Sequence, residues 1–414
     1  MLIQRWRQGS RRLFPLYEHY RTQLRKADVM ARDERIRYRD VHLKRLRSLA
    51  ELAGIDFDAT TTKTDVREKP ERYHRRSWWP STSAATGGTT GAPLVVHRTL
   101  ASVVYEQATI DHVVALHGVD LRNARQAVFR ADSFKAPDDR TAPFWYDASD
   151  RKRLFSSMHL NAASAPAILA ALADFRPDIL YCYPSALELL IAHVRDRQVE
   201  IRPHLVLTSS EYMPAALFDA VRTTFDCPLL DYYGQAERVC FASADAAGAY
   251  HFRHDYGMVE LDRGGTQGIV VGTNFHNTAQ LLPHYDTGDV IVGVEQEAGG
   301  LLEDVALGLA PFKGIAGRAG ERMVLPDGRQ IIGFNHMPRL VPGADFVQFL
   351  RTGPHALDVH VVRGASFSDA TLAAIERNVR LKVPTEVTTR YIFGDAPLRT
   401  PRGKSPIYID TTSQ

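Results

Sequence analysis

Apolar side chains recur at helical spacing among many arginines in the first 55 residues. Apolar residues placed three or four positions apart lie on one face of a helix, so the basic residues are expected to form its solvated face. The apolar positions fall into two groups, Leu13, Leu16, Tyr17 and Tyr20, and then Leu43, Leu46, Leu49 and Leu52. We therefore predict a basic, helical start at 1–55, followed by a charged surface connector at 56–79.

Short apolar runs alternate with amphipathic stretches between residues 94 and 234. A strand, a helix and another strand in this rhythm form the βαβ unit of a parallel sheet, with ligand groups at the carboxyl ends of the strands. The predicted strands are 127–130, 178–183, 205–210 and 228–234, and the predicted helices are 100–116, 166–174, 184–194 and 215–225.

The pattern changes after residue 250. G-M-V-E-L, G-I-V-V-G-T-N and D-V-I-V-G-V are short β segments separated by glycines, which is typical of a meander or distorted barrel. The C-terminal residues then alternate as β-β-α-β, at 346–351, 357–362, 369–379 and 385–392. We predict an α/β protein with two domains. A large N-terminal domain, 1–318, has parallel α/β sheets and a distorted β region, and a small mobile α+β domain spans 319–414.

Composition and charge exclude some classes of partner. The 414 residues include 51 lysines and arginines against 48 aspartates and glutamates, a net charge of +3, which gives no reason to expect nucleic acid as a partner. No apolar run reaches the roughly 18 residues that suggest a membrane span, and the basic N-terminus lacks the apolar part of a secretory signal. Three cysteines without C-x-x-C spacing favour a reduced, cytoplasmic protein.

The stretch S-T-S-A-A-T-G-G-T-T-G-A-P at 81–93 holds three glycines, four threonines and two serines. Glycine allows the backbone to approach a ligand closely, and successive N–H groups with threonine hydroxyls can cradle an anion such as a nucleotide phosphate. The Walker pattern G-x-x-x-x-G-K-[ST] is absent. Taken alone, the stretch is also compatible with a flexible linker.

Further motifs follow in a fixed order. They are T-T-K-T-D-V-R at 61–67, D-I-L-Y-C-Y-P-S-A-L at 178–187, S-S-E-Y-M-P at 209–214, D-Y-Y-G-Q-A-E-R at 231–238, Y-D-T-G-D at 285–289, A-G-R-A-G-E at 316–321 and R-T-P-R-G-K-S-P at 399–406. Their order and spacing resemble the adenylate-forming superfamily, most closely its phenylacetate–CoA ligase and capsule-gene branch. The resemblance covers about residues 60–406 and implies that a carboxylic acid is activated with ATP as an acyl-adenylate.

The resemblance also assigns nucleotide roles. Glu237 would hold Mg²⁺ together with Thr90, because this hard cation prefers oxygen ligands. Tyr233, with Tyr232 as a second candidate, would stack on adenine, and Asp289 would accept hydrogen bonds from the ribose hydroxyls. Arg318 would reach ribose or phosphate. The glycine-rich loop would wrap the β- and γ-phosphates of ATP through Thr86, Gly87, Gly88, Thr89, Thr90 and Gly91.

Each of the nucleotide candidates could instead have a purely structural role. Tyr233 could be a core tyrosine and Glu237 a surface glutamate. Asp289 could be a turn residue, and Arg318 could form a salt bridge at the hinge. Lys404 would be the catalytic lysine of the small domain, meeting the acid and the α-phosphate as charge builds; a flexible tail lysine is its alternative. Between two reaction steps the small domain would rotate, with Gly320 as a candidate pivot. Ala92 stands where the family has a lysine, and Ala236 stands where it has a hydroxyl residue. These two departures leave open the alternative that the protein binds a nucleotide without catalysing a reaction.

The acid pocket is expected between three of the motifs. An aryl acid would suit Tyr181, Tyr183 and Phe134, although aromatic residues at strand ends are often core residues. The resemblance implies CoA as the acceptor, and an amine, giving an amide, is the alternative because no CoA-specific motif is visible. The pocket candidates are Tyr183, Ser209, Glu211, Tyr212 and Gly234.

Three other interpretations stay open. Cys240, His251, His254 and Asp255 could ligate a structural zinc ion, although a single cysteine and a loose H-x-x-H spacing disfavour it. The arginine-rich N-terminus could make this a surface-interaction protein. The chain could also form a homodimer.

Overall fold

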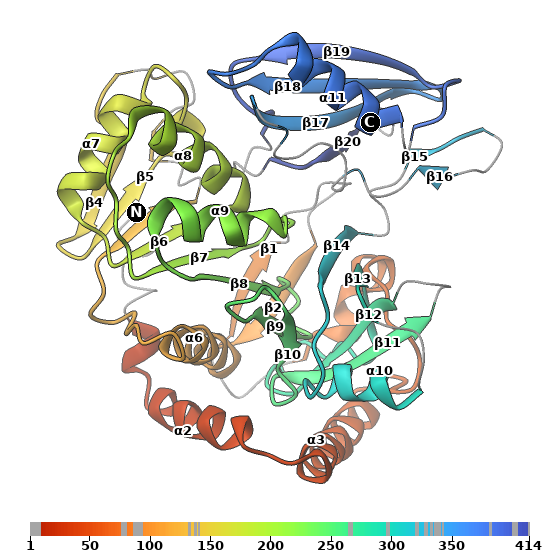
Figure 1. The fold of residues 1–414 in the computed structure, drawn as a ribbon. Coiled ribbons are helices and arrows are strands. Elements are labelled where there is room, and N and C mark those ends of the chain that lie inside the picture. Colours follow the sequence, from red (N-terminus) through yellow and green to blue (C-terminus); the bar gives the residue numbers. More distant parts are fainter. Residues whose placement is uncertain are drawn as a thin grey trace. The chain divides into compact units, whose positions relative to one another are not determined.

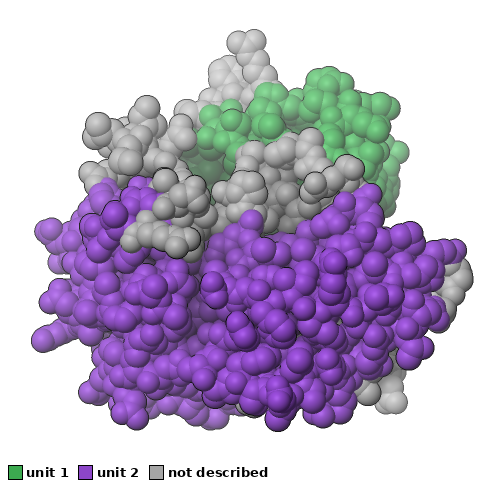
Figure 2. Space-filling model, turned by 90° about the horizontal axis from the view of Figure 1, so that it is seen from above, with its two compact units in different colours: residues 1–121, 231–315 green, residues 122–230, 316–414 purple. Residues whose placement is uncertain are grey.

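The computed structural model separates into two compact units, each made of two chain segments (Figure 2). Unit 1 comprises residues 1–121 and 231–315, and unit 2 comprises residues 122–230 and 316–414. The predicted division at residues 318 and 319 stays a prediction. The described residues are 10–75, 81–85, 94–130, 134–135, 139, 141–263, 268–294, 299–318, 323–326, 330–331, 334, 341, 343–380, 383–399 and 405–412.

Unit 1 begins with helices, as the apolar spacing predicted. They are η1 (Ser10–Leu13), α2 (Leu16–Asp28), α3 (Arg32–Leu52) and α6 (Leu100–Ala115) (Figure 1). Helix α3 buries Leu46 and Ala50, one turn apart, in a cluster that includes Phe275. Two of the predicted apolar positions are wrong, because Leu13 is 84% and Leu52 81% exposed.

The β structure of unit 1 lies in three parts. The first is a hairpin of β1 (Ser81–Ala85) and β2 (Val95–Thr99), and the second pairs residues 231–234 of β8 (Leu229–Gly234) with β9 (Phe241–Ala244), beside β10 (Tyr250–Phe252). The third confirms the predicted meander, in the order β11 (Gly257–Arg263), β12 (Gly268–Asn274), β13 (Tyr285–Val292) and β14 (Gly314–Arg318), of which only residues 314 and 315 belong to unit 1. Helix α10 (Gly299–Ala306) lies between the last two strands in sequence.

The predicted surface connector is helical over most of residues 63–73, and most of its side chains there are exposed or partly exposed. It contains α4 (Lys63–Glu68) and α5 (Pro70–Tyr73). Thr62 caps α4 by accepting from the backbone N–H of Asp65, whose carboxylate accepts from the N–H of Thr62 in return, a capping box. Thr61 forms a bridge with Tyr285 at the start of β13. The T-T-K-T-D-V-R motif therefore supports the strand that carries Y-D-T-G-D.

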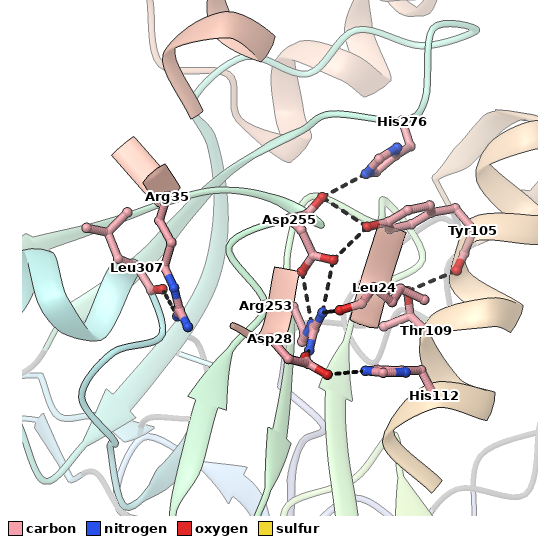
Figure 3. A network of polar contacts seen from close by, with 10 residues as sticks. All are labelled: Leu24, Asp28, Arg35, Tyr105, Thr109, His112, Arg253, Asp255, His276 and Leu307. Carbon is pink, nitrogen blue, oxygen red and sulfur yellow. Dashed lines mark hydrogen bonds and ion pairs between the residues drawn. The ribbon is translucent and has the colours of Figure 1, made fainter. Parts of the chain in front are cut away.

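A buried ion network ties α2 and α6 to the turn between β10 and β11 (Figure 3). Arg253 donates to both carboxylate oxygens of Asp255, at 2.9 and 3.0 Å, and also pairs with Asp28. Tyr105 donates to Asp255 at 2.9 Å, and His112 Nε2 lies 2.7 Å from Asp28 Oδ2. The side chains of Arg253 and Asp255 are only 12% and 3% exposed, so this network holds the N-terminal helices by charges that are largely removed from water.

The prediction of a solvated basic face fails at two N-terminal arginines. Arg12 forms a bidentate pair with the buried Asp111, at 2.6 and 2.7 Å, and Tyr17 donates to the same carboxylate. Arg35 donates to the backbone oxygen of Leu307 at 2.8 Å (Figure 3). These two arginines therefore make structural contacts within unit 1 and do not belong to a solvated face.

Unit 2 contains the predicted parallel sheet, in the order β7-β6-β3-β5-β4, parallel except for the β4–β5 edge. Apolar side chains of the strands and of α7, α8 and α9 form one core. The elements are β3 (Gln126–Phe129), β4 (Trp145–Ser149), β5 (Lys152–Phe155), η2 (Ser157–His159), α7 (Ala165–Phe175), β6 (Ile179–Cys182), α8 (Pro184–Arg197), β7 (Leu205–Ser209) and α9 (Ala216–Phe225).

The C-terminal part of unit 2 confirms the predicted β-β-α-β pattern. Its sheet has the order β19-β18-β17-β20, and α11 packs on it (Figure 1) through Ile375 and Val379. The elements are β15 (Met323–Val324), β16 (Gln330–Ile331), β17 (Ala344–Gly353), β18 (Ala356–Arg363), α11 (Asp369–Arg380), β19 (Thr388–Gly394) and β20 (Tyr408–Asp410). The predicted fold class, α/β with a small α+β part, is therefore confirmed.

Among the described residues, no helix combines the length and apolar character needed to cross a membrane.

Candidate functional site

Two tyrosine–carboxylate hydrogen bonds join the β8 region to β13. The hydroxyl of Tyr233 donates to Oδ2 of Asp289 at 2.7 Å, and the hydroxyl of Tyr285 donates to Oε1 of Glu237 at 3.0 Å. Y-Y-G-Q-A-E supplies Tyr233 and Glu237, and Y-D-T-G-D supplies Tyr285 and Asp289. Each motif thus gives one tyrosine and one carboxylate, and the structure brings three predicted nucleotide residues together within unit 1.

The hydroxyl of Tyr233 is held from two sides. Gln235 Nε2 lies 2.5 Å from this hydroxyl and 2.9 Å from Sγ of Cys240. Burial, and then the negative charge of Asp289, raise the pKa of Tyr233 well above its usual value, so the hydroxyl remains a proton donor. The side chain as a whole stays partly exposed, which is compatible with the predicted stacking on adenine.

The neighbouring Tyr232 has a different environment. Successive side chains of a strand point to opposite faces, and the ring of Tyr232 stacks on the buried Phe241, with centroids 5.4 Å apart and planes at 12°. Of the two adenine candidates, Tyr233 is therefore the one that lies beside Asp289.

A distortion of β13 directs Asp289. Val271 pairs with Asp286 while Ile269 pairs with Val290, so β13 carries extra residues at this point, and such bulges re-aim side chains. Gly288 takes a φ of +68°, a left-handed conformation that glycine adopts without strain. Thr287 fixes the turn, because its Oγ1 accepts from the N–H of Asp289 at 3.0 Å.

Backbone contacts on both sides fix Glu237. Arg98 on β2 donates to the carbonyl oxygen of Ala236, with its Nε at 2.9 Å, and Asn274 donates to the carbonyl oxygen of Arg238. Burial, and then the charge of Arg238, lower the pKa of Arg98 to about 10, so Arg98 stays cationic at neutral pH. Sequence analysis missed Arg98, although its place shortly after the glycine-rich stretch was a usable signal.

Several predicted residues are outside the described part of the structure. Residues 81–85 of the glycine-rich stretch form β1, which pairs with β2 as far as Ala85 and Val95. Lys404 and the side chain of Arg318 are likewise not described, although the backbone of Arg318 ends β14. The loop residues that fall outside the description are Thr86, Gly87, Gly88, Thr89, Thr90 and Gly91.

Four of the five pocket candidates, Tyr183, Ser209, Glu211 and Tyr212, are in unit 2, at or just after the carboxyl ends of β6 and β7. Arg130, which follows β3, donates to Oγ of Ser209 at 2.6 Å and to Oγ of Ser210 at 2.8 Å. Its guanidinium lies 4.5 Å from the ring centre of Tyr181 and 4.7 Å from that of Tyr183, within the range of cation–π attraction. Sequence analysis missed this arginine, which links the aromatic and serine candidates.

Glu211 contacts two backbone amides. Oε2 accepts from the N–H of Ser185 at 3.0 Å, and Oε1 accepts from the N–H of Ser405 at 3.1 Å. Tyr212 is partly exposed next to it, and Gly234 is an exposed residue at the end of β8.

The zinc interpretation does not hold for the described residues. Asp255 is engaged by Arg253 and Tyr105, and Cys240 is buried beside Gln235. No group of three or more histidine, cysteine, aspartate or glutamate side chains within the described ranges could hold a metal ion.

No family model matches the chain. Among curated proteins, CapK of Staphylococcus aureus is 20% identical over 245 residues, which are 58% of this chain and 54% of CapK. The match thus spans about half the length of that relative.

Solved structures of CoA ligases share the fold. A 2-hydroxyisobutyryl-CoA ligase, in the postadenylation state with 2-HIB-AMP, has a TM-score of 0.58 and 15% identity, over 90% of this chain and 86% of that one. The anthranilate CoA ligase AuaEII, in complex with anthranoyl-AMP, has a TM-score of 0.51 and 15% identity, over 78% of this chain and 65% of that one. The chain therefore has the fold of the adenylate-forming superfamily and is a distant homologue of CapK.

Proposed function

We propose that the protein is an ATP-dependent, AMP-forming acid ligase that transfers the activated acid to CoA. The observation that carries the proposal is the reciprocal pairing of Tyr233 with Asp289 and of Tyr285 with Glu237. Asp289 and Glu237 are only 8% and 7% exposed, and buried carboxylates are costly unless they are bonded. Both carboxylates are hydrogen-bonded here, and they lie on the two motifs that the resemblance assigns to nucleotide binding.

The proposed reaction has two steps. In the first, a carboxylate oxygen of the acid attacks the α-phosphorus of ATP, the bond from that phosphorus to pyrophosphate breaks, and acyl-AMP forms. In the second, the sulfur of CoA attacks the acyl carbonyl, a thioester forms, AMP leaves, and the thiol proton passes to the medium. Tyr233 and Asp289 would hold adenine and ribose, and Lys404 would stabilise charge on the acid and α-phosphate.

The donor set also suits Mg²⁺. Glu237 offers oxygen ligands, and a carboxylate with one oxygen bonded to Tyr285 has further acceptor positions. Glu237 and Thr90 are the residues that would hold the ion, which would neutralise phosphate charge.

Unit 2 supplies most of the residues proposed for the acid. Arg130 lies within cation–π distance of both Tyr181 and Tyr183 at the ends of β3 and β6. Tyr181 is partly exposed, whereas Tyr183 belongs to the core and is only 9% exposed. The partly exposed ring of Tyr181 beside a guanidinium suits an aryl carboxylic acid, because a flat ring stacks on aromatic faces and a guanidinium pairs with carboxylate. An amine acceptor, giving an amide, is the alternative second step.

Acid-dependent ATP–pyrophosphate exchange tests the first step. We expect exchange with at least one member of a panel of aryl and alkyl acids, and loss of about 10²–10³ in rate in Lys404→Ala. Mass spectrometry of products formed with CoA, or with a set of amines, then identifies the acceptor. A folded protein that binds ATP but gives no exchange with any acid would favour the non-catalytic homologue.

A further inference from the structure

Glu211 bridges two distant parts of unit 2 through the backbone. It follows β7, and its carboxylate accepts from Ser185 in the first turn of α8 and from Ser405, 194 positions further along the chain. Ser185 and Ser405 are 0% and 3% exposed. A carboxylate that accepts backbone N–H groups in such surroundings makes strong, charge-assisted bonds.

A cation on the same C-terminal segment adds to this contact. Arg399 is partly buried, which lowers the pKa of its guanidinium, while the negative charge of Glu211 acts in the opposite direction. Arg399 lies six positions before Ser405 in the sequence.

The buried side-chain amide of Gln348 bonds to both ends of the segment 398–406. Gln348 on β17 is 0% exposed, and its Nε2 donates to the backbone oxygens of Leu398 at 2.9 Å and of Pro406 at 2.8 Å. Its Oε1 accepts from the N–H of Leu398 at 2.7 Å. One side chain thus joins the two ends of residues 398–406, and Phe349 continues the pairing by donating to Ile407 at 2.8 Å.

We propose that Glu211 and Gln348 are positioning residues for the segment that carries Lys404. Gln348 fixes the ends of the segment, and Glu211 fixes Ser405, the residue directly after the lysine. Glu211 then acts through the backbone and not as a contact to the acid. The anchoring stands on geometry alone, and its catalytic consequence rests on the proposed function.

Limited digestion with trypsin tests the anchoring without requiring any ligase activity of the protein. The Lys404–Ser405 peptide bond contains the N–H of Ser405, from which Glu211 accepts a hydrogen bond. Trypsin can cleave this peptide bond only after that hydrogen bond has broken. Because bonds to charged groups are strong, we expect Glu211→Ala to speed cleavage after Lys404 by about ten- to a hundredfold, with Gln348→Ala acting likewise. Glu200→Ala, which removes a carboxylate that is 75% exposed in the same unit, is the matched control and should change nothing.

The site of cleavage separates anchoring from general unfolding. Fragments are identified by mass, and cleavage at distant sites of the same variant is the internal reference. Selective acceleration after Lys404 supports the proposal. Unchanged cleavage there in folded Glu211→Ala, or equal acceleration at all sites in both Glu211→Ala and the milder Glu211→Gln, overturns it.

A double-mutant cycle with Lys404→Ala tests the catalytic consequence. Glu211→Ala should lower the kcat of acid-dependent exchange and leave KM for the acid within about twofold, since it affects the lysine and not acid binding. In the Lys404→Ala background, Glu211→Ala should not lower kcat any further. Glu211→Gln should have a higher kcat than Glu211→Ala. A raised KM for the acid with equal losses in both backgrounds would make Glu211 an acid contact. If no variant and no wild-type protein shows exchange, the proposed function fails while the trypsin result still decides the anchoring.

Discussion

The hydroxyl of Tyr233 donates a hydrogen bond to the carboxylate of Asp289 across 56 positions of sequence, at 2.7 Å. The bond connects the last residues of β8 to a bulged turn in β13. The residue proposed to stack on adenine thus fixes the residue proposed to hold ribose, and the two roles can be separated by substitution.

Asp289→Ala should raise KM for ATP in the exchange assay by about ten- to a hundredfold, because it removes hydrogen bonds to a charged group. Tyr233→Phe keeps the ring and should change this KM by no more than about threefold, since it removes only the bond that orients Asp289. Saturating acid isolates the effect on ATP. Equal losses in the two variants would show that the pair serves the fold and not the nucleotide.

Glu237→Gln should lower the exchange rate by about 10²–10³ at saturating ATP, as for other residues that stabilise developing charge. The loss should shrink as Mg²⁺ is raised, because a weaker ligand needs more metal. Tyr285→Phe is the matched control: it removes the hydroxyl that donates to Glu237 but leaves the carboxylate. Titrating Mg²⁺ in all three proteins measures this, and an unchanged Mg²⁺ dependence in Glu237→Gln would contradict the role.

Arg253→Met should destabilise unit 1 by about 3–5 kcal/mol, the usual cost of removing one partner of a buried pair. It leaves Asp255 and Asp28 without their shared cation (Figure 3). Arg32→Met also removes an arginine from two carboxylates, Glu303 and Asp304, but at an exposed site, and should change little. Urea unfolding followed by fluorescence compares the two, and similar midpoints would show that the network is not a stability determinant.

Acid should weaken the same network. Burial acts to raise the pKa of Asp255, yet the charge and hydrogen bonds of Arg253 bring it down to about 2, against an ordinary value of 3.8. A depressed carboxyl pKa stabilises the folded state above the ordinary value, and this stabilisation is lost as the pH falls through the folded value. The stability difference between wild type and Arg253→Met should therefore narrow between about pH 4 and pH 2.

Asp345 in β17 should give the opposite pH dependence. Burial, and then the charge of Asp196 on α8, raise the pKa of Asp345 to about 6 from 3.8. The folded state thus holds the proton more tightly, and the stability of the wild type should fall as pH rises from about 4 to 6. Asp345→Asn should have the higher Tm above pH 6 and no advantage below pH 4. A Tm difference that is constant from pH 4 to 8 would contradict this.

Local pattern was sufficient for most helices and strands. The strand predicted at 205–210 is β7, Leu205–Ser209, and the helix predicted at 369–379 is α11, Asp369–Arg380, because periodicity and end signals act over a few residues. The prediction failed where a capping box makes a short helix in charged sequence, as at Thr62 and Asp65. It also failed at Leu13 and Leu52, whose spacing was helical but whose faces are exposed.

The sequence by itself determined the α/β pattern, the small α+β part and the identity of the motifs that carry Tyr233, Glu237 and Asp289, since these depend on neighbouring residues and their order. Only the tertiary structure decided how these residues pair, that Arg98 lies beside Ala236, that Arg130 lies beside Tyr181 and Ser209, and that Glu211 bonds to Ser405. Hydrogen bonds and ion pairs need atoms within about 3 Å, and folding brings together residues far apart in sequence that no local pattern relates.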